Sequence, residues 1–179
     1  NKYKAKVIIT STAEIYGKSD TIHFHEDDVR LLGPTRISWW GYSCSKAIDE
    51  FMAFAYFREK RLPVVIVRCF NTVGPRQTGQ YGMVLPKFIK AALLDQPIVV
   101  YGTGKQTRCF ADVSDVVDAL IKLMNTPKCV GEIFNVGNTE SISIEDLAKK
   151  VKEMCDSKSR IEYISYEEAF EEGFEDMMN

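Results

Sequence analysis

The sequence predicts an α/β protein whose strands run parallel. Short β-branched or apolar runs, each long enough for one buried strand, alternate with longer segments whose apolar residues recur at helical spacing. Because a parallel connection needs a crossover, this alternation implies a sheet with helices packed on its faces. The length of 179 residues is that of one compact unit with a sizeable core.

The first half of the chain is predicted to contain two strands with one helix between them. Residues 6–10 form an apolar run fit for a buried strand, and a polar loop follows as far as residue 35. A helix is predicted over 42–58 because apolar residues recur there at helical spacing, at Ile48, Phe51, Met52, Ala55 and Tyr56. After Pro63, the β-branched run 64–67 is expected in a strand buried on both faces.

The second half is predicted to continue the alternation after a Gly- and Pro-rich loop over 71–82. Its expected elements are, in order, a helix over 86–94, a strand over 97–101, a helix over 115–125, a strand over 132–136 and a helix over 144–155. Pro86 suits the first turn of its helix, and Ser143 is the expected N-cap of the last one, with Asp146 at the capping-box position. The tail 166–179 holds only acidic charges and is predicted to be a solvated edge.

Composition excludes several classes of function. A net charge of −2 argues against a nucleic-acid-binding protein, and we expect the small basic patch of Lys2, Lys4 and Lys6 to be a solvated loop. No apolar run approaches the ~20 residues of a membrane span, so no membrane association is expected. Residues 7–9 are too short a run for the apolar region of a signal peptide.

The cysteines predict a protein of a reducing compartment, and the histidines predict that the protein has no metal site. The five cysteines are scattered and contain no C-x-x-C pair, which favours free thiols over a disulfide framework and predicts a cytoplasmic protein. His23 and His25 lie close together without a cysteine nearby, so we interpret them as surface residues of a loop and expect no metal.

A Tyr and a Lys four residues apart on a helix lie on one face, where the ammonium can lower the phenol pKa from its reference of ~10. Such a tyrosine can act as a base near neutral pH. Three pairs have this spacing: Tyr42/Lys46, Tyr56/Lys60 and Tyr101/Lys105. The third spans two glycines, and the second lies among large residues, where a packed Tyr and a solvated Lys are expected. We favour Tyr42/Lys46, which has only small side chains between its members.

A second candidate lies at the carboxyl end of the first predicted strand, where open α/β sheets bind ligands. Here Ser11-Thr12-Ala13-Glu14 offers a hydroxyl that can donate to an alkoxide or carbonyl oxygen, and a carboxylate that can move a proton. The alternative interpretation of these residues is a strand-end cap followed by a surface Glu.

Taken together, the two candidates resemble the extended short-chain dehydrogenase/reductase family, which includes nucleotide-sugar epimerases, dehydratases and decarboxylases. The resemblance runs through most of the chain, in blocks that keep the family's order: STAEIYG (11–17), WGYSCSK (40–46), VRCFNTVGPRQ (67–77), GMVLPKFIKAAL (82–93), IVVYGTGKQTRCFADVSDVVDAL (98–120) and GEIFNVGN (131–138). It implies the C-terminal part of a Rossmann-like parallel sheet and a smaller α/β region that binds substrate. Residues 1–75 are expected to be the later half of the NAD-binding domain. Residues 76–179 are expected to be mostly the nucleotide-sugar region, with strands returning to the sheet.

The resemblance also implies roles for residues of the first region. Thr12 resembles the Ser/Thr that hydrogen-bonds the sugar O4, Tyr42 resembles the base, and Lys46 resembles its partner, which also holds the nicotinamide ribose. Thr10 and Phe70, with Tyr42 and Lys46, fall where the family contacts NAD. Helices equivalent to the one that bears Tyr42 form a homodimer in the family, so a homodimer is expected.

Substrate contacts are implied at five further positions. Asn71 resembles a residue that contacts the substrate at its diphosphate, and Met83 and Val84 match a backbone segment that touches the nucleotide. Tyr101 sits where the family lines the nucleoside pocket. Arg108 resembles the diphosphate clamp, a role that its bidentate guanidinium suits. Loop-organising hydrogen bonds or a surface ion pair are the alternative interpretation of Asn71 and Arg108.

Two departures from the family pattern shape the functional prediction. The G-x-x-G-x-x-G turn that cradles the cofactor pyrophosphate is absent, so we expect this chain to be the later half of such an enzyme. Ala13 stands where dehydratases carry an Asp, which counts against 4,6-dehydration, whereas Glu14 resembles the Glu of decarboxylases. The predicted function is NAD-dependent UDP-sugar 4-epimerisation through a 4-keto sugar, with UDP-glucuronate decarboxylation as the alternative. A dehydratase, a reductase of free carbonyls and a binding protein without activity remain further alternatives.

Overall fold

The computed structural model describes residues 5–18, 23–37, 39–79 and 83–169. Lys2, Lys4 and most of the predicted acidic tail lie outside these ranges. The chain divides into two compact units. The first comprises Asn1–Thr72 and Ala111–Asn138, and the second comprises Val73–Phe110 and Thr139–Asn179. The short strands β3 (Thr72–Val73) and β6 (Ala111–Asp112) lie where the chain leaves the first unit and returns to it.

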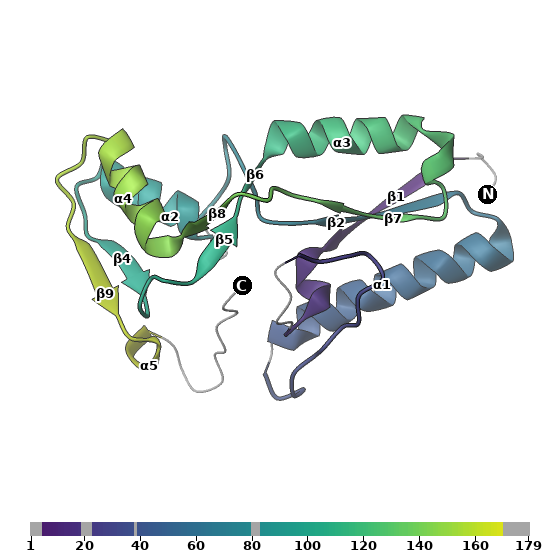
Figure 1. The fold of residues 1–179 in the computed structure, drawn as a ribbon, viewed down its shortest axis with the longest axis horizontal. Helices are drawn as coiled ribbons and strands as arrows, with labels where there is room; N and C mark the ends of the chain where they lie inside the picture. Colours follow the sequence, from purple (N-terminus) through teal and green to yellow (C-terminus); the bar gives the residue numbers. More distant parts are fainter. Residues whose placement is uncertain (1–4, 19–22, 38, 80–82, 170–179) are drawn as a thin grey trace. The chain divides into compact units, whose positions relative to one another are not determined.

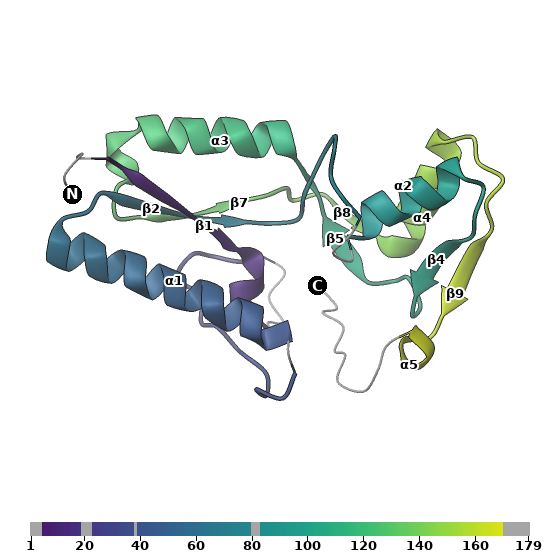
Figure 2. The ribbon, with the colours of Figure 1, turned by 180° about the vertical axis from the view of Figure 1, so that it is seen from behind.

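The first unit is a parallel sheet covered by one long helix on each face, as Figures 1 and 2 show from opposite sides. Its elements are β1 (Val7–Thr12), the 3₁₀ turn η1 (Ala13–Tyr16), α1 (Trp39–Lys60), β2 (Val64–Cys69), α3 (Val113–Asn125), the 3₁₀ turn η2 (Pro127–Cys129) and β7 (Ile133–Val136). Strand β2 is central and pairs in parallel with β1 on one side and β7 on the other. This arrangement confirms the predicted α/β class.

Strand β2 is buried on both faces, as its β-branched run predicts. Val64 and Ile66 pack in the cluster that includes Ala53 of α1, whereas Val65 and Val67 pack on the opposite face with Cys129. These four side chains are at most 2% exposed. Burial of side chains this size stabilises the unit by about 1.5–3 kcal/mol each.

The second unit packs two helices against short strands. Its elements are α2 (Val84–Leu93), β4 (Ile98–Tyr101), β5 (Thr107–Cys109), β8 (Ser141–Ser143), α4 (Ile144–Met154), β9 (Ile161–Ile164) and α5 (Tyr166–Ala169). Strands β4 and β9 pair in parallel, and β5 and β8 pair antiparallel. The core joins Phe88 of α2, Ile98 and Val100 of β4, and Leu147 and Val151 of α4.

The start of α4 confirms the predicted cap, and the described part of the acidic tail forms a short helix. The Ser143 hydroxyl accepts a hydrogen bond from the Asp146 backbone N–H at 3.0 Å. Within the predicted solvated tail, Tyr166–Ala169 form the short helix α5, in which Glu168 is exposed and Tyr166 is half-buried. Gly102 lies so close to the Tyr166 ring that an added Cβ would come 2.5 Å from it, so an aromatic residue anchors this acidic segment.

The apolar residues whose spacing predicted helix α1 lie on its exposed face and not on the face toward the sheet. Four of the five predicting side chains are large and at least half exposed, among them Phe51 and Tyr56. Tyr56, at 53% exposed, corrects the expectation of a packed tyrosine. The buried face carries Ser43, Ala47, Glu50 and Ala53 instead, and Phe54 and Phe57 pack against the cluster that contains Val64 and Ile66 of β2.

Other expectations concern cysteines, histidines and membrane spans. All five cysteines are free thiols, as predicted. His23 and His25 are exposed in the loop between η1 and α1, which confirms their interpretation as surface residues. Among the described residues, no helix combines the length and the apolar character that crossing a membrane requires.

Candidate functional site

Thr12 ends β1 and begins the turn that follows. It is the N-cap of η1, with extended backbone angles, and its hydroxyl accepts a hydrogen bond from the Glu14 N–H at 3.3 Å. Because that N–H occupies an oxygen lone pair, the hydroxyl hydrogen of Thr12 is available to a ligand at the carboxyl end of the strand. Thr12 thus has the capping role of the alternative interpretation, and its role as a donor to a ligand stays a prediction.

Tyr42 and Lys46 lie on the first turns of α1, beside the end of β1. The Tyr42 side chain is 49% exposed. The Lys46 Nζ donates to the Thr10 carbonyl at 3.1 Å and lies 3.5 Å from the Asp49 carboxylate. The structure thus brings Lys46 to Thr10, one of the residues predicted to contact the cofactor, and leaves Tyr42 accessible to a ligand.

Ser43 makes a second connection between α1 and the end of β1. Its side chain is completely buried, and its hydroxyl donates to the Glu14 carbonyl at 2.8 Å. Since Ser43 follows Tyr42 directly, this hydrogen bond fixes the backbone of the candidate acid next to the candidate base.

A buried polar network beneath these residues was not predicted from the sequence. The Arg68 guanidinium of β2, 3% exposed, forms a two-pronged ion pair with Glu50 of α1 through contacts of 3.0 and 2.8 Å. Arg68 also donates to the Tyr16 hydroxyl at 2.8 Å, and that hydroxyl donates to the Asn135 side chain at 2.7 Å. An arginine after four apolar residues of a doubly buried strand was the available signal, because a buried charge needs a partner.

The network also fixes the protonation of its members. Burial raises the pKa of Tyr16 above its usual value, so its hydroxyl stays protonated near neutral pH and remains a donor. Burial opposes the charge on Arg68, but its hydrogen bonds to Glu50 and Tyr16 outweigh that effect and raise the Arg68 pKa. The guanidinium is therefore a permanent cation inside the unit.

Phe70 and Asn71 follow β2 and also belong to the first unit. The Phe70 N–H donates to the Val136 carbonyl at 2.9 Å, which extends the pairing of β2 with β7. Its side chain lies against Gly137, where an added Cβ would come within 2.7 Å. The Asn71 carbonyl accepts from the Ala111 N–H at 2.9 Å, so the backbone of Asn71 has the loop-organising role that was the alternative interpretation.

The remaining predicted substrate residues belong to the second unit. Met83 is the N-cap position of α2 and Val84 is its first residue. Tyr101 is the last residue of β4, and Arg108 is the central residue of β5, with its Nη1 donating to the Thr107 carbonyl at 2.7 Å. The structure thus divides the predicted site residues between the units, with catalytic and cofactor residues in the first and most substrate residues in the second.

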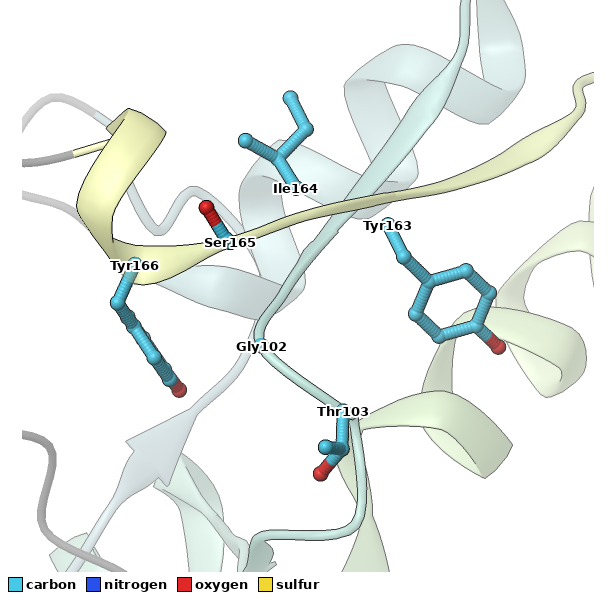
Figure 3. A pocket seen from close by; sticks show the side chains of 6 residues that line it. All are labelled: Gly102, Thr103, Tyr163, Ile164, Ser165 and Tyr166. Atoms are coloured by element: carbon cyan, nitrogen blue, oxygen red, sulfur yellow. The ribbon is translucent and has the colours of Figure 1, made fainter.

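A cavity of about 390 Å³ lies beside Tyr101 in the second unit. Figure 3 shows Tyr163 and Tyr166 on either side of Gly102, with Thr103 below; Ile164 and Ser165 complete the lining. The Gln106 side chain donates to both the Tyr101 carbonyl and the Tyr166 hydroxyl at 3.0 Å, which ties the cavity to the end of β4. Tyr163 and Tyr166 were not predicted to line a cavity, because their segment of the sequence lacks strong helical or strand patterning.

Comparison with known families agrees with this arrangement. Residues 1–137 match the model of the NAD dependent epimerase/dehydratase family. The chain belongs to this family. The match covers all of the first unit except its final residue, and it confirms the resemblance drawn from the sequence blocks.

The relatives include decarboxylases and an epimerase. Over 179 residues, 99% of the chain, it is 44% identical to the UDP-N-acetyl-alpha-D-glucosaminuronate decarboxylase of Bacillus cytotoxicus, of which it covers 55%. It is 34% identical to UDP-glucuronic acid decarboxylase 1 of Xenopus tropicalis over 90% of the chain and 38% of that protein. A solved UDP-glucuronic acid 4-epimerase from Bacillus cereus, in complex with UDP-glucuronic acid and NAD, is 28% identical with a TM-score of 0.78. That comparison covers 89% of this chain and 48% of the epimerase.

Proposed function

We propose that this chain carries the catalytic residues of an NAD-dependent decarboxylase of UDP-hexuronates. Support comes from the decarboxylases among its relatives, including the one that is 44% identical over nearly the whole chain. This favours the alternative from the sequence analysis over 4-epimerisation. The chain spans about half the length of its bacterial decarboxylase relative, so the proposal concerns the full-length protein.

The observation that carries the proposal is the hydrogen bond from Ser43 to the Glu14 carbonyl. It holds an acidic residue one helix position from Tyr42, and Glu14 also follows Thr12 within the same turn. A 4-epimerase needs only the tyrosine and the hydroxyl for proton transfer at C4. Decarboxylation needs in addition a proton for C5, and we assign that transfer to the carboxyl of Glu14, whose backbone this hydrogen bond fixes beside α1.

The first unit offers groups that fit a nicotinamide cofactor. Lys46 and Tyr42 are accessible near the carboxyl end of β1, and the Ser11 hydroxyl there is buried without a partner among the described residues. Thr10, Tyr42, Lys46 and Phe70 would hold the cofactor. When bound, NAD supplies the acceptor for the hydride from C4 and returns it at the end of the cycle.

The chain's own residues carry the proton chemistry at C4. The Tyr42 phenolate oxygen takes the proton of the C4 hydroxyl as that carbon is oxidised. The Thr12 hydroxyl oxygen already accepts a hydrogen bond from the Glu14 backbone N–H. Its hydrogen is donated to the same C4 oxygen. Lys46, tied to Thr10, places a positive charge at this end of the helix.

Loss of CO₂ then follows from the 4-keto sugar. The C5–carboxylate bond breaks, its electron pair moves to C5, and the adjacent C4 carbonyl takes up the charge as an enolate that Thr12 stabilises. The Glu14 carboxyl gives a proton to C5 and regains one from water. Tyr42 finally returns its proton to the C4 oxygen, so the net reaction exchanges a carboxylate for a hydrogen.

The second unit is proposed to bind the nucleotide. The cavity beside Tyr101 has aromatic walls suited to a nucleoside, and the Arg108 guanidinium of the same unit suits a diphosphate.

We also propose a homodimer that covers the exposed stripe of α1, which includes Ile48, Phe51 and Met52. Sedimentation velocity of the wild type and of Phe51→Glu tests that proposal, since a dimer through this face should dissociate in the variant.

The test of the reaction is product analysis with the full-length protein. We would incubate it with NAD and, separately, UDP-glucuronate, UDP-N-acetylglucosaminuronate and UDP-glucose, and identify products by chromatography with mass spectrometry. Loss of CO₂ from a hexuronate is expected, whereas a new product of unchanged mass would identify an epimerase and refute the proposal. Tyr42→Phe should abolish turnover yet leave binding of the sugar nucleotide largely intact.

A matched pair of variants tests Glu14. Removing a group that transfers a proton should lower kcat by about 10²–10⁴-fold in Glu14→Gln. Glu59→Gln, at an exposed acid near the end of α1, should keep wild-type kcat. A Glu14→Gln enzyme that releases CO₂ at the wild-type rate would remove Glu14 from the mechanism.

A further inference from the structure

The buried ion pair of Arg68 and Glu50 lies near the carboxyl ends of β1 and β2, where the candidate catalytic residues begin. Arg68 is paired in register with Ser11, and the next pair in the ladder is Cys69 with Thr12. Glu50 is four residues after Lys46 on α1. The ion pair therefore joins the strand beside Thr12 to the helix that carries Tyr42.

The Tyr16 hydroxyl extends this connection to the η1 turn. Tyr16 is the last residue of η1, which begins directly after Thr12 and contains Glu14. Its hydroxyl accepts from Arg68 and donates to Asn135 of β7, so it links the turn to two strands. Its ring stacks on Phe24 at 4.5 Å, so the hydroxyl can be removed without emptying the space around the ring.

The polar ties between α1 and the β1 end follow one face of the helix. The Ser43 hydroxyl donates to the Glu14 carbonyl, and the Lys46 ammonium donates to the Thr10 carbonyl. The Glu50 carboxylate accepts from Arg68. These positions are three and four residues apart, which places them in one row along the helix. The segment of α1 from Ser43 to Glu50 is thus hydrogen-bonded to the end of β1, to the turn that follows it or to β2.

Stability alone gives little reason to bury such a pair. Taking two charges out of water is costly, and well-packed apolar residues of similar volume often serve a core as well or better. The rest of this core is apolar, with Val64 and Ile66 on the same face of β2 as Arg68. What an apolar pair lacks is direction, because hydrogen bonds fix orientation whereas apolar contacts tolerate sliding.

We propose that Tyr16, Arg68 and Glu50 are positioning residues, whose network fixes the turn bearing Thr12 and Glu14 against the turns of α1 bearing Tyr42 and Lys46. The inference rests on the proposed function for its catalytic consequence. Its structural consequence is independent of that function. None of the three residues touches the reacting atoms in this account.

Tyr16→Phe is the primary test. In the full-length protein, kcat for the UDP-hexuronate should fall by about tenfold while KM changes by less than about twofold, because alignment of groups is lost and binding is not. The control is Ser159→Ala in the second unit, which also removes a buried hydroxyl, one bonded to Ser157 at 2.9 Å. Ser159→Ala should lose about as much thermal stability as Tyr16→Phe but keep kcat within about twofold of the wild-type value. Equal losses of kcat in both variants would refute positioning.

Hydrogen exchange separates this inference from the proposed reaction. The Glu14 amide is bonded to Thr12 and the Gly17 amide to Glu14, so both report on the η1 turn. Tyr16→Phe should accelerate exchange at these two amides by about tenfold relative to the core of β2, even in a protein that lacks decarboxylase activity. Unchanged exchange at both would overturn the proposal whatever the protein catalyses.

An apolar replacement of the ion pair distinguishes positioning from folding. The double variant Glu50→Leu with Arg68→Met should retain the thermal stability of the wild type while kcat stays at least about tenfold lower. Full activity in a folded double variant would show that the network serves folding alone. If the double variant does not fold, Tyr16→Phe and its exchange measurement still decide the question.

Discussion

Ser43→Ala is expected to destabilise the first unit, whereas Ser45→Ala, two residues along the same helix, is not. Both changes remove one hydroxyl from α1. The Ser43 hydroxyl is buried and crosses to the Glu14 carbonyl, whereas the Ser45 hydroxyl is exposed and bonds at 2.7 Å to the Tyr42 carbonyl within the helix. The pair thus separates a hydrogen bond between elements from one within a single turn.

The magnitude follows from the partners that remain. A buried hydrogen bond contributes a net of about 0.5–1.5 kcal/mol, and the Glu14 carbonyl still accepts from the Gly17 N–H at 3.1 Å, so it is not left unpaired. Alanine recovers up to about 0.5 kcal/mol of helix propensity at either position. Taking the middle of that range, about 1 kcal/mol, and subtracting the recovered propensity leaves an expected loss of about 0.5–1 kcal/mol for Ser43→Ala, and about zero for the exposed Ser45→Ala.

Guanidinium unfolding followed by tryptophan fluorescence is the assay. Both tryptophans, Trp39 and Trp40, lie in α1, so the signal reports on the first unit. The midpoint for Ser43→Ala should move to lower denaturant without a change in slope. Equal midpoints for Ser43→Ala and Ser45→Ala would refute the idea that this bond holds Glu14 against the helix.

Two further predictions concern the second unit. Gly102→Ala should lower its thermal stability by more than about 1 kcal/mol, since Gly102 has a φ of 66° and an added Cβ would meet the Tyr166 ring; a variant as stable as wild type would contradict this geometry. The Ser143 hydroxyl lowers the pKa of Asp146 through a hydrogen bond. That pair therefore stabilises the fold above the unfolded-state pKa of about 3.9, and the contribution is lost as pH falls through the lower folded-state pKa. Ser143→Ala should flatten this dependence in thermal melts from pH 6 to about 2, and an unchanged profile would count against the cap.

Local patterns predicted the elements whose formation depends on local chemistry. The run Val64–Val67 forms a strand because β-branched side chains pack well on both faces of a sheet. Ser143 begins α4 because a hydroxyl satisfies an N–H that the helix leaves unpaired. Tyr42 and Lys46 were located by their spacing on one helix, which depends only on the geometry of that helix.

Orientation and buried charge were beyond the sequence because they depend on distant partners. Nothing near Glu50 in the sequence distinguishes it from a solvated acid, since its partner Arg68 lies 18 residues away on another element. Tyr16 likewise meets Asn135 only because β7 returns to the sheet after more than 100 residues. Apolar periodicity identified α1 as a helix, but periodicity alone does not say whether the apolar face meets the sheet or another surface.

The proposed dimer would cover the outer face of α1, whereas the proposed active site lies beside its buried face, so we predict that activity and association are separable. Phe54 and Phe57 of α1 pack toward the sheet, and the hydrogen bonds of Ser43, Lys46 and Glu50 add direction to that apolar packing. Covering the outer face in a dimer would add apolar burial without changing these ties. Changes at Phe51 should therefore alter the concentration dependence of assembly more than the turnover of assembled enzyme, and changes at Tyr16 should do the reverse. A Tyr16 variant that dissociates, or a Phe51 variant that assembles normally yet loses turnover, would show that the two faces are coupled.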